Sequence, residues 1–176
     1  TFTNKAAEQM RERIRQMVSG RKSREIFMGT FHSIFARILR TEADRIGFPA
    51  NFTIYDASDA KNLIKTIVKE MNLPDDKYKP NVVASRISQA KNALVTPGAY
   101  LANSTHATED RRAQIPELGN IYNVYCQRCK HNGAMDFDDL LLQTNILLRD
   151  CPDVLERYQK QFKYILVDEY QDTNYA

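Results

Sequence analysis

The chain has 176 residues, which suffices for one domain with a hydrophobic core or for a domain fragment that carries an insertion. Apolar residues make up 43% of it and charged residues 27%, which is typical of a globular protein and excludes a disordered or membrane-spanning one. The sequence has no apolar stretch of transmembrane length and no signal-peptide pattern at its N-terminus, so we expect a cytoplasmic protein.

The net charge of +3 is unevenly distributed. Residues 1–40 contain nine Lys and Arg against three Asp and Glu, whereas residues 137–176 contain four against eight. This pattern suggests a basic front that faces a polyanion and an acidic end suited to a cation. Solvated helix faces are the alternative, and charge alone does not decide between the two.

The first forty residues alternate between strand-like and helical patterns. The first four residues resemble a strand end that runs into a helix capped by Asn4, and Gly20 would end that helix. The apolar run 26–28 predicts a short buried strand. Apolar residues at helical spacing then predict a helix that begins near Phe31 and stops before Gly47.

The middle of the chain has the pattern of an all-helical insertion. Asp56 is placed to cap one helix and Pro80 to begin a second. A polar stretch at 103–110 leads into a third helix over residues 116–132.

Cys126 and Cys129 form a C-x-x-C pair followed by His131, so a metal or redox site has to be considered. No second pair of ligands completes a tetrahedral zinc site, and the surrounding apolar residues have helical spacing. We therefore interpret both cysteines as packing residues, with a redox or metal role as the alternative.

A second mixed segment begins near Asp136, which is placed to cap a helix, and Pro152 opens a shorter one. The apolar run 164–167 predicts a buried strand that ends at Asp168 and Glu169. Open α/β sheets bind ligands at the carboxyl ends of their strands. We expect the two ends of the chain to share one such sheet.

The most specific signal is the string from Val167 to Asn174, which has the sequence VDEYQDTN and is here called the carboxylate string. Nucleoside triphosphatases hold magnesium with an Asp at the tip of an apolar strand, because a hard cation prefers oxygen ligands. The Glu that follows is placed to orient and deprotonate an attacking water. A solvated loop would explain a bare Asp-Glu pair better than it explains eight such residues.

The carboxylate string resembles the magnesium motif of superfamily 1 helicases of the UvrD/Rep/PcrA type. Three further segments resemble the same family in the same order: TFTNKAA at 1–7, GTFHS at 29–33 and DFDDL at 136–140. The likeness spans essentially the whole chain. It implies an α/β parent with a P-loop NTPase, RecA-like motor domain, of which this chain would be a mainly α-helical fragment with a small parallel-sheet remnant.

The resemblance also implies a division into domains. Residues 1–39 and 136–176 would belong to the motor domain. Residues 40–135 would form the helical insertion known in the family as subdomain 1B.

Roles for individual residues follow from the same resemblance. Asp168 would coordinate Mg²⁺, Glu169 would be the general base beside the metal, and Gln171 would sense the γ-phosphate of ATP and couple it to DNA. The contacts to single-stranded DNA would be Phe2, Asn4 and Lys5 in the first segment and Thr30 and His32 in the second. Taken singly, Phe2 is more simply a core residue and His32 a buried imidazole, but their spacing with the carboxylate string favours DNA.

The implied activity of the parent is ATP-driven 3′-to-5′ translocation along single-stranded DNA with unwinding of duplex DNA. The sequence contains no G-x-x-x-x-G-K-[S/T] loop, so we expect the chain to begin and end within the motor and to be inactive alone. One alternative is a helicase-nuclease subunit of the AddA or RecB kind, which the short interval between Thr30 and Asp168 disfavours. Another is a non-catalytic DNA-binding or interaction module, which the presence of Asp168, Glu169 and Gln171 disfavours.

Lys91 and Asn92 fall near the end of the second predicted insertion helix, before a Pro97-Gly98 turn. Our hypothesis is that Lys91, with Asn92 beside it, holds phosphates of duplex DNA ahead of the motor, as this subdomain does in the helicases it resembles. A solvated lysine near a helix terminus is the alternative.

Overall fold

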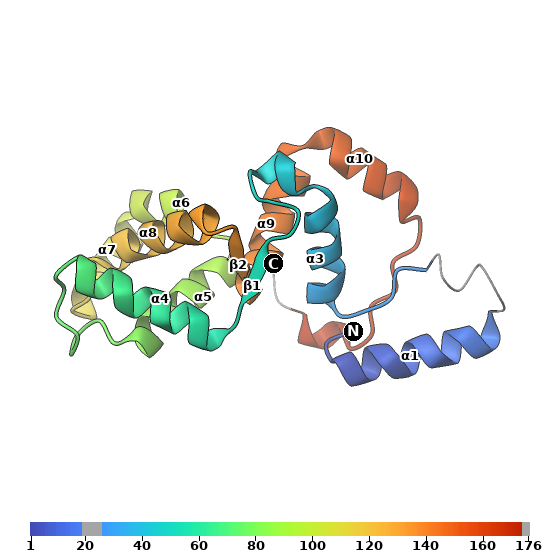
Figure 1. The fold of residues 1–176 in the computed structure, drawn as a ribbon, viewed down its shortest axis with the longest axis horizontal. Helices are drawn as coiled ribbons and strands as arrows, with labels where there is room; N and C mark the ends of the chain where they lie inside the picture. The colour runs from blue at the N-terminus through green and yellow to red at the C-terminus, as the bar shows by residue number, and fades with distance from the viewer. Residues whose placement is uncertain (19–25, 174–176) are drawn as a thin grey trace.

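The structure, a computed structural model, describes residues 1–18 and 26–173 and is mainly α-helical (Figure 1). Its helices and strands are α1 (Asn4–Met17), α3 (Phe31–Thr41), the 3-10 helix η1 (Ala43–Ile46), β1 (Thr53–Tyr55), α4 (Ala57–Glu70), α5 (Pro80–Asn92), α6 (Pro97–Ala102), α7 (Ser104–Arg112), α8 (Leu118–His131), β2 (Ala134–Asp136), α9 (Phe137–Asp150), α10 (Pro152–Gln161) and the 3-10 helix η2 (Tyr170–Asp172). The predicted helix end at Gly20 and the last residue of the carboxylate string, Asn174, lie outside the described residues. Among the helices that are described, none has both the length and the apolar character that a bilayer crossing requires.

Four helices begin where the sequence predicts. Asp56 and Asp136 cap α4 and α9, and each forms a capping box with the Asp three residues later. Pro80 and Pro152 are the first residues of α5 and α10, positions at which a backbone N–H would have no helical partner. These local signals therefore fix the starts of α4, α5, α9 and α10.

The first helix begins at the predicted cap itself, and its actual cap is the residue before it. Thr3 caps α1, because its side chain accepts a hydrogen bond from the Ala6 N–H, and Asn4 is the first helical residue. The prediction of Asn4 as the cap is therefore wrong. The polar stretch at 103–110 is helical as well. Asn103 caps α7, and the residues after it form most of that helix.

The parallel sheet lies elsewhere than predicted. β1 and β2 pair in parallel, with Tyr55 opposite Asp136, and form a two-stranded sheet. The runs 26–28 and 164–167 do not form strands. Both strand predictions, and the sheet shared by the chain ends, are therefore wrong.

An extended segment becomes a strand only when a neighbouring strand supplies hydrogen bonds, and neither run has such a partner among the described residues. Leu166 is 96% exposed and Tyr164 is 91% exposed, so this apolar run lies in solvent instead of in a sheet. The segments that contain these two runs still contact each other, because the ring of Phe27 packs edge-on against Phe162 with 4.9 Å between centroids.

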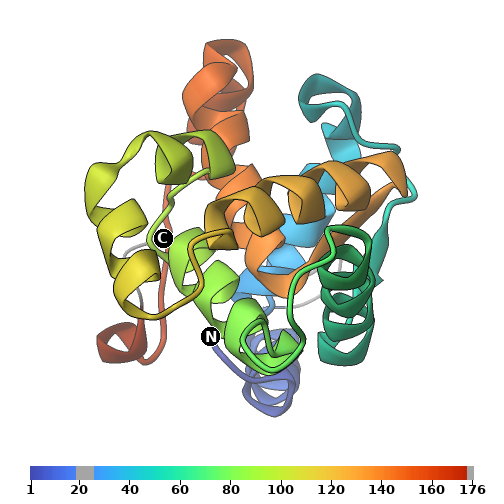
Figure 2. The same cartoon turned by 90° about the vertical axis from the view of Figure 1, so that its left-hand side faces the viewer.

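Two hydrophobic clusters lie on either side of the short sheet. Figure 1 shows α4 to α8 on one side of the strands and α1, α3, α9 and α10 on the other. Figure 2 views the molecule from the α4–α8 side, with α10 farther from the viewer. The first cluster includes Ile64, Ile67, Val83, Ile121 and Tyr122, and the second includes Leu39, Phe52, Met135, Leu140 and Val154. Phe52 packs in the second cluster although it lies beyond residue 40, and the predicted division into domains stays a prediction.

A buried ion pair joins the two clusters at the C-terminal end of α5. The side chain of Lys91 has no exposed surface, and its Nζ lies 2.7 Å from Asp136 Oδ2 and 2.7 Å from Asp139 Oδ1. The Tyr125 hydroxyl donates to the same Asp136 oxygen at 2.8 Å. Burying a charge is costly unless the charge is paired and hydrogen-bonded, and this arrangement meets that condition.

The surroundings shift the pKa of each of these three groups. Burial by itself lowers the pKa of Lys91, but the Asp139 and Asp136 carboxylates outweigh it and hold that pKa well above its usual value. Burial also opposes ionisation of Asp136, and the Lys91 ammonium outweighs that effect and keeps the pKa of Asp136 below its ordinary value. Burial raises the pKa of Asp139 to about 6, against the attraction of Lys91.

This burial contradicts the hypothesis that Lys91 holds duplex phosphates. An ammonium with no exposed surface and two carboxylate partners cannot reach a phosphate oxygen in this arrangement. Helical spacing correctly places Lys91 at the end of α5, but it gives no sign of the two carboxylates that α9 brings to it.

We predict that Lys91→Met lowers the free energy of unfolding by about 3–5 kcal/mol, because it leaves buried carboxylates without their cation. Urea unfolding followed by circular dichroism measures this change. Lys61→Ala, which removes an exposed lysine of α4, is the control and should stay within about 0.5 kcal/mol of the parent. An unfolding midpoint of Lys91→Met equal to that of the parent would contradict the role of the ion pair.

Candidate nucleic-acid interface

A cavity of about 280 Å³ is lined by residues at the starts of α1 and α3, in the first turn of α9 and at the end of η2. Two predicted DNA-contact residues from separate segments of the sequence, Phe2 and His32, both line it. Asp172 and Thr173 of the carboxylate string line it as well. The other lining residues are Thr1, Phe31, Phe35, Asn92, Asp138 and Leu141. We call this cavity the aromatic pocket.

Phenylalanine rings form one wall of the aromatic pocket. The centroid of Phe2 lies 5.4 Å from that of Phe31, and Phe31 lies 6.1 Å from Phe35 along α3. Phe2 is nevertheless 37% exposed, so part of its ring is open to a ligand. An aromatic ring that is held on one side and open on the other is suited to stacking on a nucleobase.

Two helix N-termini border the pocket. Asn4 and Lys5 are exposed in the first turn of α1, where backbone N–H groups and a lysine favour an anion. Thr30 is buried and caps α3, since its hydroxyl accepts a hydrogen bond from the Ser33 N–H at 3.2 Å. The side chain of Thr30 is therefore used to hold the start of α3 in place, which positions His32 two residues later.

His32 projects from the first turn of α3 and is partly buried. Its ring lies 5.5 Å from the ring of Phe137 at the start of α9. Burial lowers the pKa of His32, and the nearby Asp138 carboxylate partly offsets that effect. A lowered pKa favours the neutral imidazole, which can both donate and accept a hydrogen bond.

The predicted metal and catalytic residues lie in a turn beside the pocket. Asp168, Glu169 and Gln171 are all exposed, and Glu169 has a left-handed backbone with φ of 55°. Such a φ is uncommon for a residue other than glycine. The structure thus brings the carboxylate string close to Phe2 and His32 through Asp172 and Thr173, but Asp168 and Glu169 do not line the aromatic pocket.

Asp168 and Glu169 fit Mg²⁺ by donor type, because Mg²⁺ takes one or two protein carboxylates and completes its shell with water and phosphate oxygens. The described part of the chain contains no group of three or more His, Cys, Asp or Glu side chains arranged to hold a metal ion. Two carboxylates alone leave most of the coordination shell of a Mg²⁺ ion to other oxygen ligands.

Of the ten residues that line the pocket, only Phe2 and His32 were predicted as contacts to single-stranded DNA. Asp138 belongs to the segment 136–140 and Asn92 was considered with Lys91 for duplex DNA, and Nδ2 of Asn92 donates to Oδ1 of Asp138 at 2.8 Å. Asp172 and Thr173 belong to the carboxylate string, whose roles were assigned to its earlier residues. Adjacency to a motif was the available signal, but only the fold shows which neighbours face the pocket.

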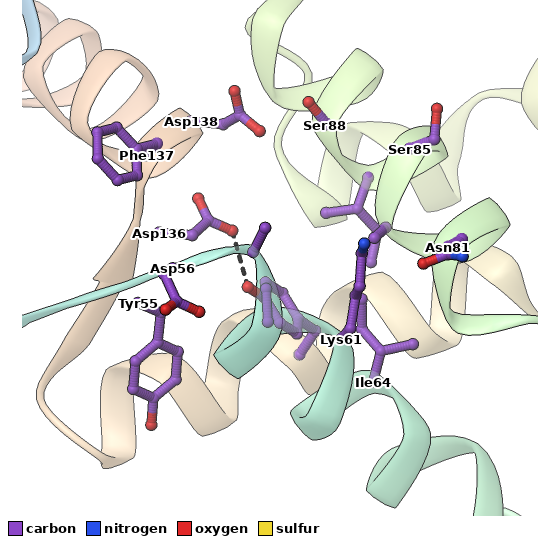
Figure 3. A pocket seen from close by; sticks show the side chains of 15 residues that line it. Tyr55, Asp56, Lys61, Ile64, Asn81, Ser85, Ser88, Asp136, Phe137 and Asp138 are labelled. Atoms are coloured by element: carbon purple, nitrogen blue, oxygen red, sulfur yellow. Dashed lines mark hydrogen bonds between the residues drawn. The ribbon is translucent and has the colours of Figure 1, made fainter.

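A second cavity of about 370 Å³ lies between α4, α5 and the start of α9 (Figure 3). Figure 3 shows Asp136, Phe137 and Asp138 on one side and Ser85 and Ser88 of α5 on the other. None of the site residues predicted from the sequence lines this cavity, although Asp138 borders both cavities.

The cysteine pair lies in α8, away from both predicted sites. Cys129 is buried in the first hydrophobic cluster and Cys126 packs against that cluster. Burial raises the pKa of both thiols, to about 12 for Cys129. A thiol that stays protonated is a poor nucleophile and a poor metal ligand, which agrees with the interpretation as packing residues.

Comparisons with known proteins match the whole chain. The family model described as UvrD/REP helicase N-terminal domain matches residues 1–176. The chain is 45% identical over 176 residues to a protein named ATP-dependent DNA helicase PcrA from Staphylococcus aureus (strain Mu50 / ATCC 700699). It is 42% identical to the PcrA of Leuconostoc citreum and 43% identical to that of Staphylococcus epidermidis. Each alignment covers 100% of this chain and 23% of the relative.

The chain belongs to the UvrD/REP helicase family, within the N-terminal domain of that family. It spans 23% of the length of the PcrA relatives, so it corresponds to a fragment of those proteins. The family predicted from the four sequence segments is therefore confirmed.

We predict that Asp138→Asn lowers the pKa of His32 further, because the substitution removes the carboxylate that opposes the effect of burial. A two-dimensional NMR titration of the imidazole signals measures the pKa of His32, with His106 of α7 as an internal control. Because folding already lowers the pKa of His32, its contribution to stability is present above pH 6.5 and is lost as the pH falls. An unchanged or higher pKa of His32 in the variant would contradict the assigned contact.

Proposed function

We propose that this segment forms part of the single-strand DNA track and of the nucleotide site of an ATP-dependent DNA helicase. The whole protein would translocate 3′-to-5′ on single-stranded DNA and unwind duplex DNA. Membership in the UvrD/REP family and the names of the PcrA relatives support ATP and DNA as its ligands. We also propose a cytoplasmic location, and a motor domain (1–39 and 136–176) interrupted by a helical insertion (40–135).

The aromatic pocket is the observation that carries this proposal. It gathers Phe2 and His32 from two segments and places them against Asp172 and Thr173 of the carboxylate string. A base would stack on the open part of Phe2, while the first turns of α1 and α3 offer Lys5 and backbone N–H groups to the adjacent phosphates.

The same arrangement supports a coupling between nucleotide and DNA. Gln171 lies one residue before Asp172, so a movement of Gln171 in response to a γ-phosphate would displace a wall of the pocket. Asp168 would hold Mg²⁺ with Glu169 beside it, and Glu169 would accept a proton from the attacking water. The bound metal would supply charge neutralisation on the phosphates.

We propose that the 176 residues alone do not turn over ATP appreciably. The sequence has no G-x-x-x-x-G-K-[S/T] loop, and phosphoryl transfer rests almost entirely on positioned phosphates and electrostatic stabilisation.

We predict that Phe2→Ala weakens binding of a fluorescent single-stranded oligonucleotide by roughly fivefold or more, because a stacked base is lost. Fluorescence anisotropy across a salt series measures the dissociation constant, and the parent's affinity should fall as salt rises because bound phosphates release counterions. Leu101→Ala, which truncates an exposed side chain of α6, is the control. Equal affinities of Phe2→Ala and the parent, or binding that salt does not weaken, would refute the DNA assignment.

We predict a separate effect for Glu169→Gln in a longer protein that joins this segment to a P-loop. Hydrolysis of ATP should fall by roughly 10²-fold or more while ATP binding stays nearly intact, as loss of a general base requires. Steady-state turnover and nucleotide titration measure the two quantities. Turnover equal to the parent's would remove Glu169 from the role of base.

A further inference from the structure

The last two residues of α5 both bind the first turn of α9. Lys91 forms ion pairs with Asp136 and Asp139, and the Asn92 amide donates a hydrogen bond to Asp138 at 2.8 Å. The Asn92 amide also donates to the Ser88 carbonyl at 2.9 Å, which fixes its direction. Polar side chains of α5 therefore contact three of the four residues that open α9.

The residues held in this way face the aromatic pocket. Phe137 packs against the ring of His32, and Asp138 acts electrostatically on the same imidazole. Asn92 and Asp138 both line the pocket with His32 and Phe2. The contacts therefore run from α5 through the first turn of α9 to His32.

We propose that Asn92 is a positioning residue for single-strand DNA binding: it anchors Asp138, so that the first turn of α9 holds His32 in the orientation that grips DNA. Lys91 supports the same turn from the buried side. The proposal rests on the function proposed above for the aromatic pocket. It makes the grip on DNA depend on how α5 of the helical insertion docks on the motor segment.

The geometry distinguishes this role from a direct phosphate contact and from a purely structural one. The Asn92 amide has a carboxylate partner, and a polyanion approaching Asp138 would be repelled by that carboxylate. Asn92 is partly exposed and lies outside both hydrophobic clusters, so its side chain carries little of the core packing. Its contribution would therefore appear in the His32 orientation more than in the stability of the fold.

Asn92→Ala in the full chain tests the proposal. The variant should bind a single-stranded oligonucleotide roughly fivefold more weakly, because the first turn of α9 no longer holds His32 in the orientation that binds DNA, and this loss corresponds to about one typical hydrogen bond. The NMR signals of the His32 ring should shift, and its nuclear Overhauser contact with Phe137 should weaken, while the His106 signals stay in place. Asn81→Ala, at the exposed opposite end of α5, is the matched control and should leave both readouts unchanged.

The outcomes separate the two proposals. If Phe2→Ala weakens binding but Asn92→Ala changes neither affinity nor the His32 signals, the positioning role is wrong and the DNA pocket stands. If Phe2→Ala and Asn92→Ala both bind as the parent does, the proposed function fails as well. If Asn92→Ala shifts the signals of His32 and His106 alike, the effect is a general loosening of the fold and the positioning role is overturned.

Discussion

Lys91 has no exposed surface and two carboxylate partners, and the arrangement of the two hydrophobic clusters depends on this contact. An isolated ammonium in such a place would lose its hydration without compensation, so Lys91 can be buried only where α5 and α9 are docked together. Besides pairing with Lys91, Asp136 ends β2, caps α9 and accepts a hydrogen bond from the Tyr125 hydroxyl. Asp136 thus links α5, α8, β2 and α9 at a single point, and Asp138 in the same helical turn lines the aromatic pocket.

The helices could be predicted from the sequence because their signals are local. An Asp that caps a helix, or a Pro in its first turn, acts on N–H groups within three residues, and Asp56, Pro80, Asp136 and Pro152 show this. The strand predictions failed because a strand needs a partner that its own residues do not specify. The apolar run 164–167 has the composition of a buried strand but no neighbouring strand in the described chain, whereas 53–55 forms one by pairing with a segment far along the sequence.

The residues of the candidate site were likewise predicted from the sequence only where the signal was local. Phe2, His32 and the carboxylate string were found because each lies in a segment whose residues resemble a helicase motif, and the structure places parts of all three around one pocket. The environment of Lys91 was not predicted, since neither charge nor helical spacing reveals that α9 brings Asp136 and Asp139 to it. Asn92 and Asp138 are a second such case, because their hydrogen bond joins residues on different helices.

The charges around the aromatic pocket indicate how a DNA strand would lie in it. Asp138 and Asp172 put two carboxylates on the lining, and at short range each repels a phosphate. Lys5 and the N-terminal N–H groups of α1 lie outside the lining and attract one. On the function proposed above, a bound strand would lie with its base turned inward against Phe2 and its backbone along the starts of the helices, so that the acidic residues would select the orientation of the strand instead of opposing its binding.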